Sequence, residues 1–240
     1  MTDFASSFEA CAKAIRKYDP DRYFSALFAP AEKRPFLFAL YALNHELAHV
    51  VESVREPMIG EIRLQWWRET LEGARVGNPR PHDVVRAVAA TFAAVDLPLE
   101  LIDAIIDARS FDLTRTPFAG DAARDAYLDA TSGNLMRLAS RVLGSENDVL
   151  AREAGLAYGL AGLLRNQAVT GHRILPDVIT ASADALTHFA KARRMKRPGA
   201  SLAAFLPASL VPLYLRDPAR DVSLHRRQWA LLGSALRGRV

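Results

Sequence analysis

Apolar residues recur at steps of three and four positions along almost the whole chain, which is the spacing of amphipathic helices. Pro, Gly and Asn residues interrupt this pattern at short intervals, and no run alternates with the period of two that is typical of a strand. The pattern therefore predicts helices at residues 4–17, 32–55, 58–76, 82–94, 99–115, 121–143, 147–168, 178–194, 202–215 and 223–237.

The gaps between these helices are too short to be linkers between independent domains, and no repeat with a period of roughly 20 to 50 residues occurs. We therefore expect one all-α domain over residues 1–240. Half of the residues are hydrophobic, so the chain can bury a sizeable core.

Two predicted helices carry polar residues where a helix inside a bundle should be apolar. In 32–55, a polar stripe lies beside the apolar one and consists of Tyr41, His45, His49 and Glu52. In 147–168, three glycines reduce the bulk of one face just before Arg165 and Asn166, so that a neighbouring helix or a ligand can approach closely. We expect the two helices to face each other across a cavity, with Tyr41, His45, His49, Glu52 and Asn166 lining it.

A metal site is an alternative for part of the polar stripe. His45, His49 and Glu52 are spaced so that all three can point the same way, and two histidines with one carboxylate can bind Zn²⁺ or Fe²⁺. Such a site also needs an open position and supporting hydrogen bonds, for which the sequence gives no sign. Polar lining of a cavity is therefore the favoured interpretation.

Adjacent Trp66 and Trp67 project about 100° apart on a helix, so both can be buried only if a neighbour covers each. Core packing is favoured, and a cavity wall or a partner surface is the alternative for one of them.

The lone cysteine, Cys11, cannot form an internal disulfide. Because no targeting segment and no apolar run of roughly 18 residues is present, we expect a cytoplasmic protein.

The net charge of +4 conceals an asymmetry between the two parts of the chain. Residues 190–240 contain 11 Lys and Arg and two Asp, a net charge of +9, which leaves −5 on residues 1–189. The predicted helix 223–237 combines basic and aromatic residues and is typical of a helix that lies on an anionic membrane; the contact candidates are Arg226, Arg227, Trp229 and Arg237. A solvated charged face, or a helix that packs on the bundle, is the alternative. No pattern typical of nucleic-acid binding occurs.

Four segments resemble the conserved blocks of squalene and phytoene synthases. The first block matches ALYALNHELAHVVESV at 39–54 and GEIRLQWWRETLEG at 60–73. The second matches YLDATSGNLMRLASRVLG at 127–144 and AGLAYGLAGLLRN at 154–166, followed by GHRILP at 171–176. The resemblance implies the all-α isoprenoid-synthase bundle with a central cavity.

The synthases of this family carry Asp-rich motifs in both blocks, which hold Mg²⁺ and a diphosphate. Here Ala48 and His49 stand where the resemblance places the first two Asp, and only Glu52 falls at the third. In the second block Asn166 takes the place of the Asp that follows the arginine. Arg165 and Arg173 match basic positions of the family and are candidates to hold a phosphate or a lipid headgroup.

Within the family, residues 46–73 most resemble the branch that contains a mitochondrial assembly factor of respiratory complex I. This resemblance implies a non-catalytic assembly or binding factor whose partner is a complex I subunit or assembly intermediate, located peripherally on the inner membrane. An isoprenoid or a lipid is the ligand that such a cavity would take. The alternative is an active prenyltransferase that condenses isoprenoid diphosphates. We expect no cofactor in the first case, and Mg²⁺ only in the second.

Overall fold

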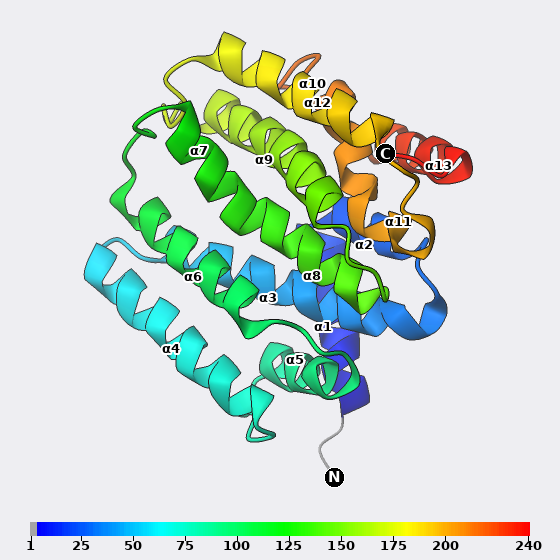
Figure 1. Ribbon diagram of the computed structural model, residues 1–240. Helices are drawn as coiled ribbons and strands as arrows, with labels where there is room; N and C mark the ends of the chain where they lie inside the picture. The colour runs from blue at the N-terminus through cyan, green and yellow to red at the C-terminus, as the bar shows by residue number, and fades with distance from the viewer. Residues whose placement is uncertain (1–3) are drawn as a thin grey trace.

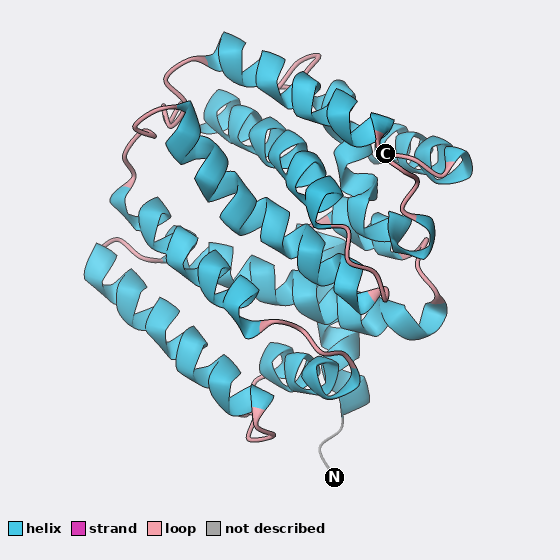
Figure 2. Cartoon of the chain, viewed as in Figure 1, coloured by secondary structure: helices cyan, strands magenta, loops and turns pink. Residues whose placement is uncertain are grey.

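The computed structural model describes residues 4–240, and throughout this range all regular elements are helical and none is a strand (Figure 1 and Figure 2). The all-α prediction is thereby confirmed. The longer helices are α1 (Phe4–Tyr18), α3 (Arg34–Ser53), α4 (Pro57–Arg75), α5 (Asp83–Ala94), α6 (Leu99–Thr114), α9 (Asp148–Thr170), α10 (Val178–Arg194) and α13 (Leu224–Arg237). The shorter ones are α2 (Pro20–Ala26), α7 (Asp121–Leu128), α8 (Asn134–Val142), α11 (Leu202–Phe205) and α12 (Val211–Tyr214). Single turns complete the chain at η1 (Ala31–Lys33), η2 (Asp129–Gly133), η3 (Gly199–Ser201) and η4 (Leu206–Leu210).

The predicted helix positions differ from the structure in three places, and the first is the helix predicted at 121–143, which the π-helical turn η2 divides into α7 and α8. Helix α2 was not predicted; it begins because the Asp19 side chain accepts a hydrogen bond from the backbone N–H of Arg22, at 3.1 Å, and Pro20 occupies the first turn. The single helix predicted at 202–215 is divided into α11, η4 and α12. Pro207 and Pro212 lack the N–H that a continuous helix needs, so the hydrogen-bond pattern changes there.

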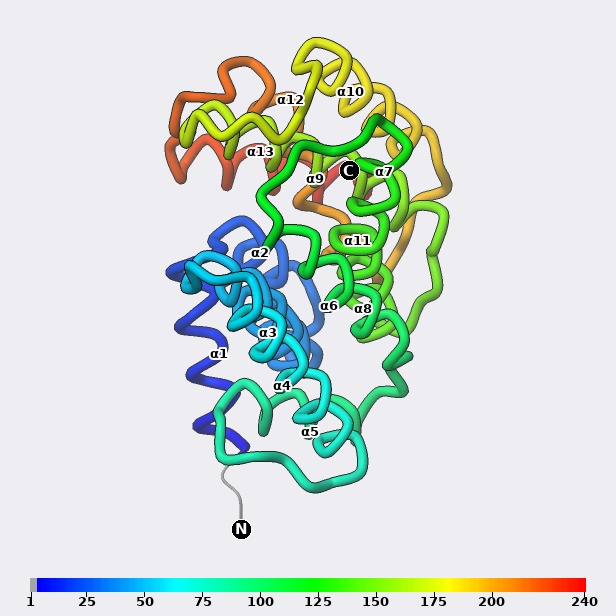
Figure 3. The backbone as a smooth tube through the Cα atoms, turned by 90° about the vertical axis from the view of Figure 1, so that its left-hand side faces the viewer, coloured from blue at the N-terminus to red at the C-terminus, as the bar shows by residue number. Residues whose placement is uncertain are grey.

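Two apolar clusters hold the helices together. The first is built around α3, whose buried stripe includes Leu40, Leu43 and Leu47 and packs with α1, α5, α6 and α8. The second is built around α9 and joins it to α10, α12 and α13. Two perpendicular views place α10, α12 and α13 at one end of the molecule and α4 and α5 at the other (Figure 1 and Figure 3).

The glycines of α9 serve two different purposes. A Cβ added at Gly155 would lie 2.6 Å from the backbone of Gly133, so α9 and the π-helical turn η2 pack backbone against backbone. A Cβ added at Gly162 would meet nothing within 4 Å. The predicted close approach therefore involves a neighbouring element at Gly155, whereas Gly162 borders open space.

Candidate functional site

A cavity of about 830 Å³ lies between α3 and α9. Its wall on the α3 side includes Asn44, Ala48 and Glu52, and its wall on the α9 side includes Gly162 and Asn166. The remaining lining residues come from the α1–α2 junction, the end of α6 and the residues after it, the α7–η2 segment, α8, the segment after α9, α12 and α13. As predicted, the two helices with unusual polar residues both contribute to one cavity.

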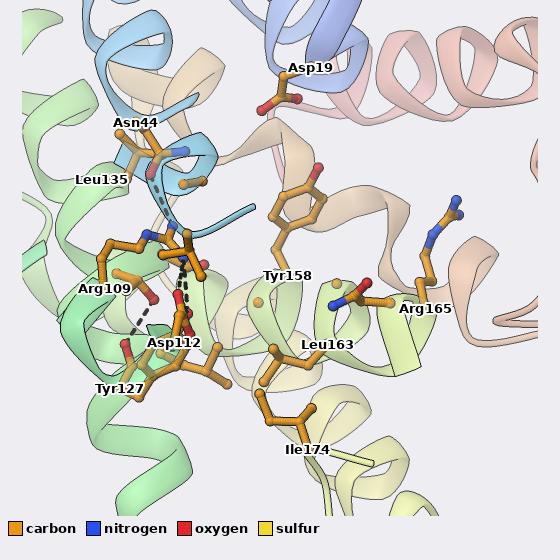
Figure 4. A pocket seen from close by; sticks show the side chains of 18 of the residues that line it. Asp19, Asn44, Arg109, Asp112, Tyr127, Leu135, Tyr158, Leu163, Arg165 and Ile174 are labelled. Carbon is orange, nitrogen blue, oxygen red and sulfur yellow. Dashed lines mark hydrogen bonds and ion pairs between the residues drawn. The ribbon is translucent and has the colours of Figure 1, made fainter. Parts of the chain in front are cut away.

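Arg109 organises one wall of this cavity, as Figure 4 shows. Its Nη1 donates to Asp112 Oδ2 at 3.1 Å and to Tyr127 Oη at 3.0 Å, and the Tyr127 hydroxyl donates to the same carboxylate at 2.9 Å. Burial raises the pKa of Tyr127, so its hydroxyl keeps the proton that it donates. Burial alone would lower the pKa of Arg109, but Tyr127 and Asp112 outweigh it and raise that pKa.

Asp21 is the centre of a second buried cluster. One of its carboxylate oxygens accepts a hydrogen bond from Tyr158 Oη at 3.1 Å and another from Tyr214 Oη, and the second oxygen accepts one from Arg227 Nη1 at 2.9 Å. Burial and the nearby Asp21 charge raise the pKa values of both tyrosines, which therefore remain donors. The cluster fastens α13 and α12 to the start of α2.

Beside this cluster, Arg22 and Asp19 form a third pair, with 2.6 Å between Nη1 and Oδ2. The Arg22 guanidinium lies 5.0 Å from the ring centre of Tyr158 and 5.9 Å from that of Tyr41. Asp19, Asp21 and Asp112 each line the cavity, and each is already engaged by an arginine.

Two lining arginines differ from these because, within residues 4–240, no carboxylate lies closer than 4.0 Å to either guanidinium. The Arg165 guanidinium stacks 4.0 Å from the ring centre of Tyr214, and its Nη2 lies 4.0 Å from the exposed Asp221. Its Nη1 is buried and has no hydrogen-bond partner among the described residues. Arg115 donates to the carbonyl oxygen of Val54 at 3.2 Å. These two side chains give the cavity a capacity to bind an anion.

The residues that the sequence predicted for the cavity divide into two groups. Glu52, Asn166 and Arg165 line it. Tyr41, His45, His49 and Arg173 do not contribute to its lining. Tyr41 is buried beneath Arg22. His45 and His49 each follow a lining residue by one position, which turns their side chains about 100° away, and Arg173 is exposed.

The three candidate metal ligands are not gathered into a ligand set. His45 stacks on Tyr18 with 4.5 Å between ring centres, and His49 Nδ1 lies 3.4 Å from Glu52 Oε2. Across residues 4–240, no group of three or more His, Cys, Asp or Glu side chains is arranged to hold a metal ion.

At the C-terminal helix, the structure corrects one of four contact candidates. Arg227 turns inward and pairs with Asp21, because its helix position faces α2 rather than solvent. Arg226, Trp229 and Arg237 are exposed. Within residues 4–240, none of the helices combines the length and the apolarity that crossing a bilayer requires.

Sequence reasoning missed much of the polar wall. The missed residues include Asp19, Asp21, Arg22, Arg109, Asp112, Tyr127, Tyr158, Tyr214 and Arg115. A usable signal existed at 109–115, where charged residues interrupt the apolar face of the α6 pattern near its end. The pairing of Asp21 with Arg227 had no local signal, since 206 positions separate them.

Comparisons with known proteins agree on the type of fold and domain. The squalene/phytoene synthase family profile matches residues 15–174. Among curated proteins, the human "NADH dehydrogenase (ubiquinone) complex I, assembly factor 6" is 31% identical over 166 residues, which is 68% of this chain and 50% of that protein. A 15-cis-phytoene synthase of Synechocystis sp. is 23% identical over 67% of this chain and 50% of that protein. The chain thus spans about half the length of the curated relatives it matches.

Solved structures extend the likeness over nearly the whole chain. A crystal structure of a dehydrosqualene synthase superposes with a TM-score of 0.79 and 14% identity, over 96% of both chains. A squalene synthase from Alicyclobacillus acidocaldarius superposes with a TM-score of 0.68 and 17% identity, over 99% of this chain and 96% of that one. At these identities the likeness establishes the fold alone, and the fold is the isoprenoid-synthase bundle that the sequence predicted.

Proposed function

This chain belongs to the squalene/phytoene synthase family, and on that premise we propose that it is a binding or assembly factor for respiratory complex I. It acts at the cytoplasmic face of a bacterial inner membrane and keeps the family cavity as an anion-binding pocket, without condensing isoprenoid diphosphates. The observation that carries the proposal is the 31% identity to the human complex I assembly factor over 68% of this chain.

The chemistry of the cavity supports a role other than prenyl transfer. Mg²⁺ in such sites takes carboxylate oxygens and the phosphates of the substrate. Asp19, Asp21 and Asp112 are committed to arginines, and a carboxylate would have to give up a charge-assisted hydrogen bond to bind a cation. Ala48 supplies no ligand, and Glu52 is left as one carboxylate. These residues do not fit the Mg²⁺–diphosphate site of a synthase.

Helix α4 supplies a surface suited to a protein partner. Met58, Ile59, Ile62 and Trp66 lie within one sector of about 100° on this helix, and all four are exposed, Met58 to 74% and Ile62 to 64%. The neighbouring Trp67 is buried in the core instead. An exposed apolar stripe of this kind is typical of an interaction site. We assign it to the complex I subunit or assembly intermediate.

The partner surface is tested in cells of the source organism. Deleting the gene should lower the amount of assembled complex I and its NADH oxidation, and the wild-type gene should restore both. A Met58→Asp/Ile62→Asp variant should fail to restore them because charges on the stripe oppose burial. Val149→Asp, at a residue 68% exposed on α9, is the matched control and should restore both. Normal complex I in the deletion strain contradicts the proposal.

The cavity is tested with purified protein. Inorganic pyrophosphate and farnesyl diphosphate should bind, and Arg165→Met should weaken binding by about 10- to 100-fold, since a hydrogen bond to a charged group contributes about 1.5–3 kcal/mol. Arg173→Met removes an exposed arginine outside the lining and should leave binding unchanged. Farnesyl or geranylgeranyl diphosphate with Mg²⁺ should give no squalene or phytoene by mass spectrometry. Steady turnover to either product would establish the prenyltransferase alternative, which the phytoene synthase relatives favour.

A further inference from the structure

Helix α13 has one side buried in the bundle and one side exposed to solvent. Leu231 and Ser234 face the bundle, and Arg227 on the same side pairs with Asp21. On the opposite side, Trp229 is 72% exposed and Leu236 is 80% exposed. The two are seven positions apart, which places them in line along the helix axis. The helix is therefore packed against the bundle on one side while it presents two large apolar side chains to solvent on the other.

Basic residues surround this apolar line. Arg226 and Arg237 are exposed on the flank of the same face. Of the 11 Lys and Arg in residues 190–240, all except Arg227 are exposed, and the same segment contains only two acidic residues.

The basic segment that follows α10 adjoins the end of α13. A Cβ built on Gly238 would lie 3.7 Å from Arg197 Cδ. The exposed Arg197 therefore extends the positive surface beyond α13 itself.

From this arrangement we propose that α13 and the basic segment that follows α10 dock the protein on an anionic lipid bilayer, with Trp229 and Leu236 inserted at the depth of the headgroups. A convex helix with protruding apolar side chains and charges of one sign fits a plane of repeated anionic headgroups. Trp is favoured at that depth because its ring is amphipathic. This surface is separate from the α4 stripe, so the inference stands independently of complex I.

The test uses the full chain and vesicles at low ionic strength, with co-sedimentation as the readout. The protein should bind phosphatidylglycerol/phosphatidylethanolamine vesicles, should not bind phosphatidylcholine vesicles, and should be released as salt rises. Arg226→Glu/Arg237→Glu should reduce the partition coefficient by about 25-fold or more, since each basic residue near such a surface contributes about fivefold. Trp229→Ser should weaken binding and abolish the blue shift of tryptophan fluorescence that anionic vesicles cause.

Two controls separate docking at this surface from general attraction. Lys13→Glu/Arg55→Glu makes the same change in net charge with exposed residues of the other half of the chain, and it should bind as the wild type does. Ile179→Ala removes an apolar side chain that is 83% exposed on α10, and it too should leave binding unchanged. Circular dichroism verifies that each variant is folded. A wild type that ignores anionic vesicles, or a control that loses binding as strongly as Arg226→Glu/Arg237→Glu, overturns the proposal.

Discussion

Replacing Asp21 by Asn tests whether the buried cluster at the cavity fastens the C-terminal helices to the rest of the fold. The substitution keeps the shape of the side chain and one carbonyl acceptor but removes the charge. Tyr158, Tyr214 and Arg227 all donate to this carboxylate. An amide cannot serve three donors equally, so the guanidinium loses its counter-charge.

The magnitude follows from the burial of the pair. Removing one partner of a buried ion pair costs about 3–5 kcal/mol because the other charge stays desolvated. The side chains of Arg227 and Asp21 are 17% and 9% exposed, so water partly screens the arginine. We therefore expect Asp21→Asn to lower the free energy of unfolding by about 2–4 kcal/mol, which corresponds to a fall in Tm of roughly 5–12 °C for a chain of this size.

The assay is urea unfolding followed by circular dichroism. Asp96→Asn is the matched control: Asp96 Oδ1 accepts from Arg75 at 2.6 Å, but Asp96 is 93% exposed, and loss of this pair should cost less than about 1 kcal/mol. Arg227→Met completes a double-mutant cycle, and the two changes at the cluster should couple by about 1–3 kcal/mol. A cost below about 1 kcal/mol for Asp21→Asn, or additive effects in the cycle, would refute the reasoning.

Three further predictions concern α9 and α1. Gly155→Ala should lower the free energy of unfolding by about 1–3 kcal/mol because the added Cβ meets the Gly133 backbone. Gly162→Ala on the same helix should leave the free energy of unfolding unchanged or raise it by up to about 1 kcal/mol. Chemical unfolding of both variants checks this. The Cys11 thiol should react with an aromatic disulfide at pH 8 about a thousandfold more slowly in the folded chain than in urea, because burial raises its pKa from 9.0 to about 12. As the pH rises, the Cys11 thiol loses its proton in the unfolded chain before it does so in the folded chain. The free energy of unfolding should therefore be unaffected below pH 9.0 and should fall between pH 9.0 and about 12. Cys11→Ala should flatten this fall when unfolding is measured as a function of pH.

Most of the helices follow from the sequence because their burial is one-sided. The apolar stripe of α3 is visible from its spacing, and Leu40, Leu43 and Leu47 are all buried as it requires. Helix α2 was not predicted because its seven residues are too few to show a periodic apolar pattern. The N-terminal cap at Asp19 was the sequence feature that could have indicated it. The division at 206–210 depends on how Pro207 is accommodated, which packing decides.

The candidate site is less predictable because its partners are far apart in the sequence. A polar residue in an apolar stripe marks a position of interest, and Asn166 was found in this way. Each step of one residue along a helix turns the side-chain direction by about 100°, so the sequence alone does not fix which polar residues of a helix point into the cavity. Here Glu52 lines the cavity and His49 does not. A contact such as the one between Asp21 and Arg227 forms only when α13 packs against α2.

The polar wall supports the proposal that the cavity binds an anion. The cavity of about 830 Å³ is lined by three paired arginines, Arg22, Arg109 and Arg227. The desolvation of each charge opposes folding, and a fold with apolar residues of similar size at these positions would be at least as stable. Their carboxylate partners offset that cost, so these pairs add no free charge. Arg165 differs because the carboxylate it contacts, that of the exposed Asp221, lies 4.0 Å away. Its buried Nη1, like Arg109 Nε and Arg227 Nε, has no partner among the described residues, and a buried donor without an acceptor costs free energy unless another molecule supplies one. A phosphate oxygen would satisfy that donor with or without prenyl transfer, so the proposed anion binding does not depend on catalysis.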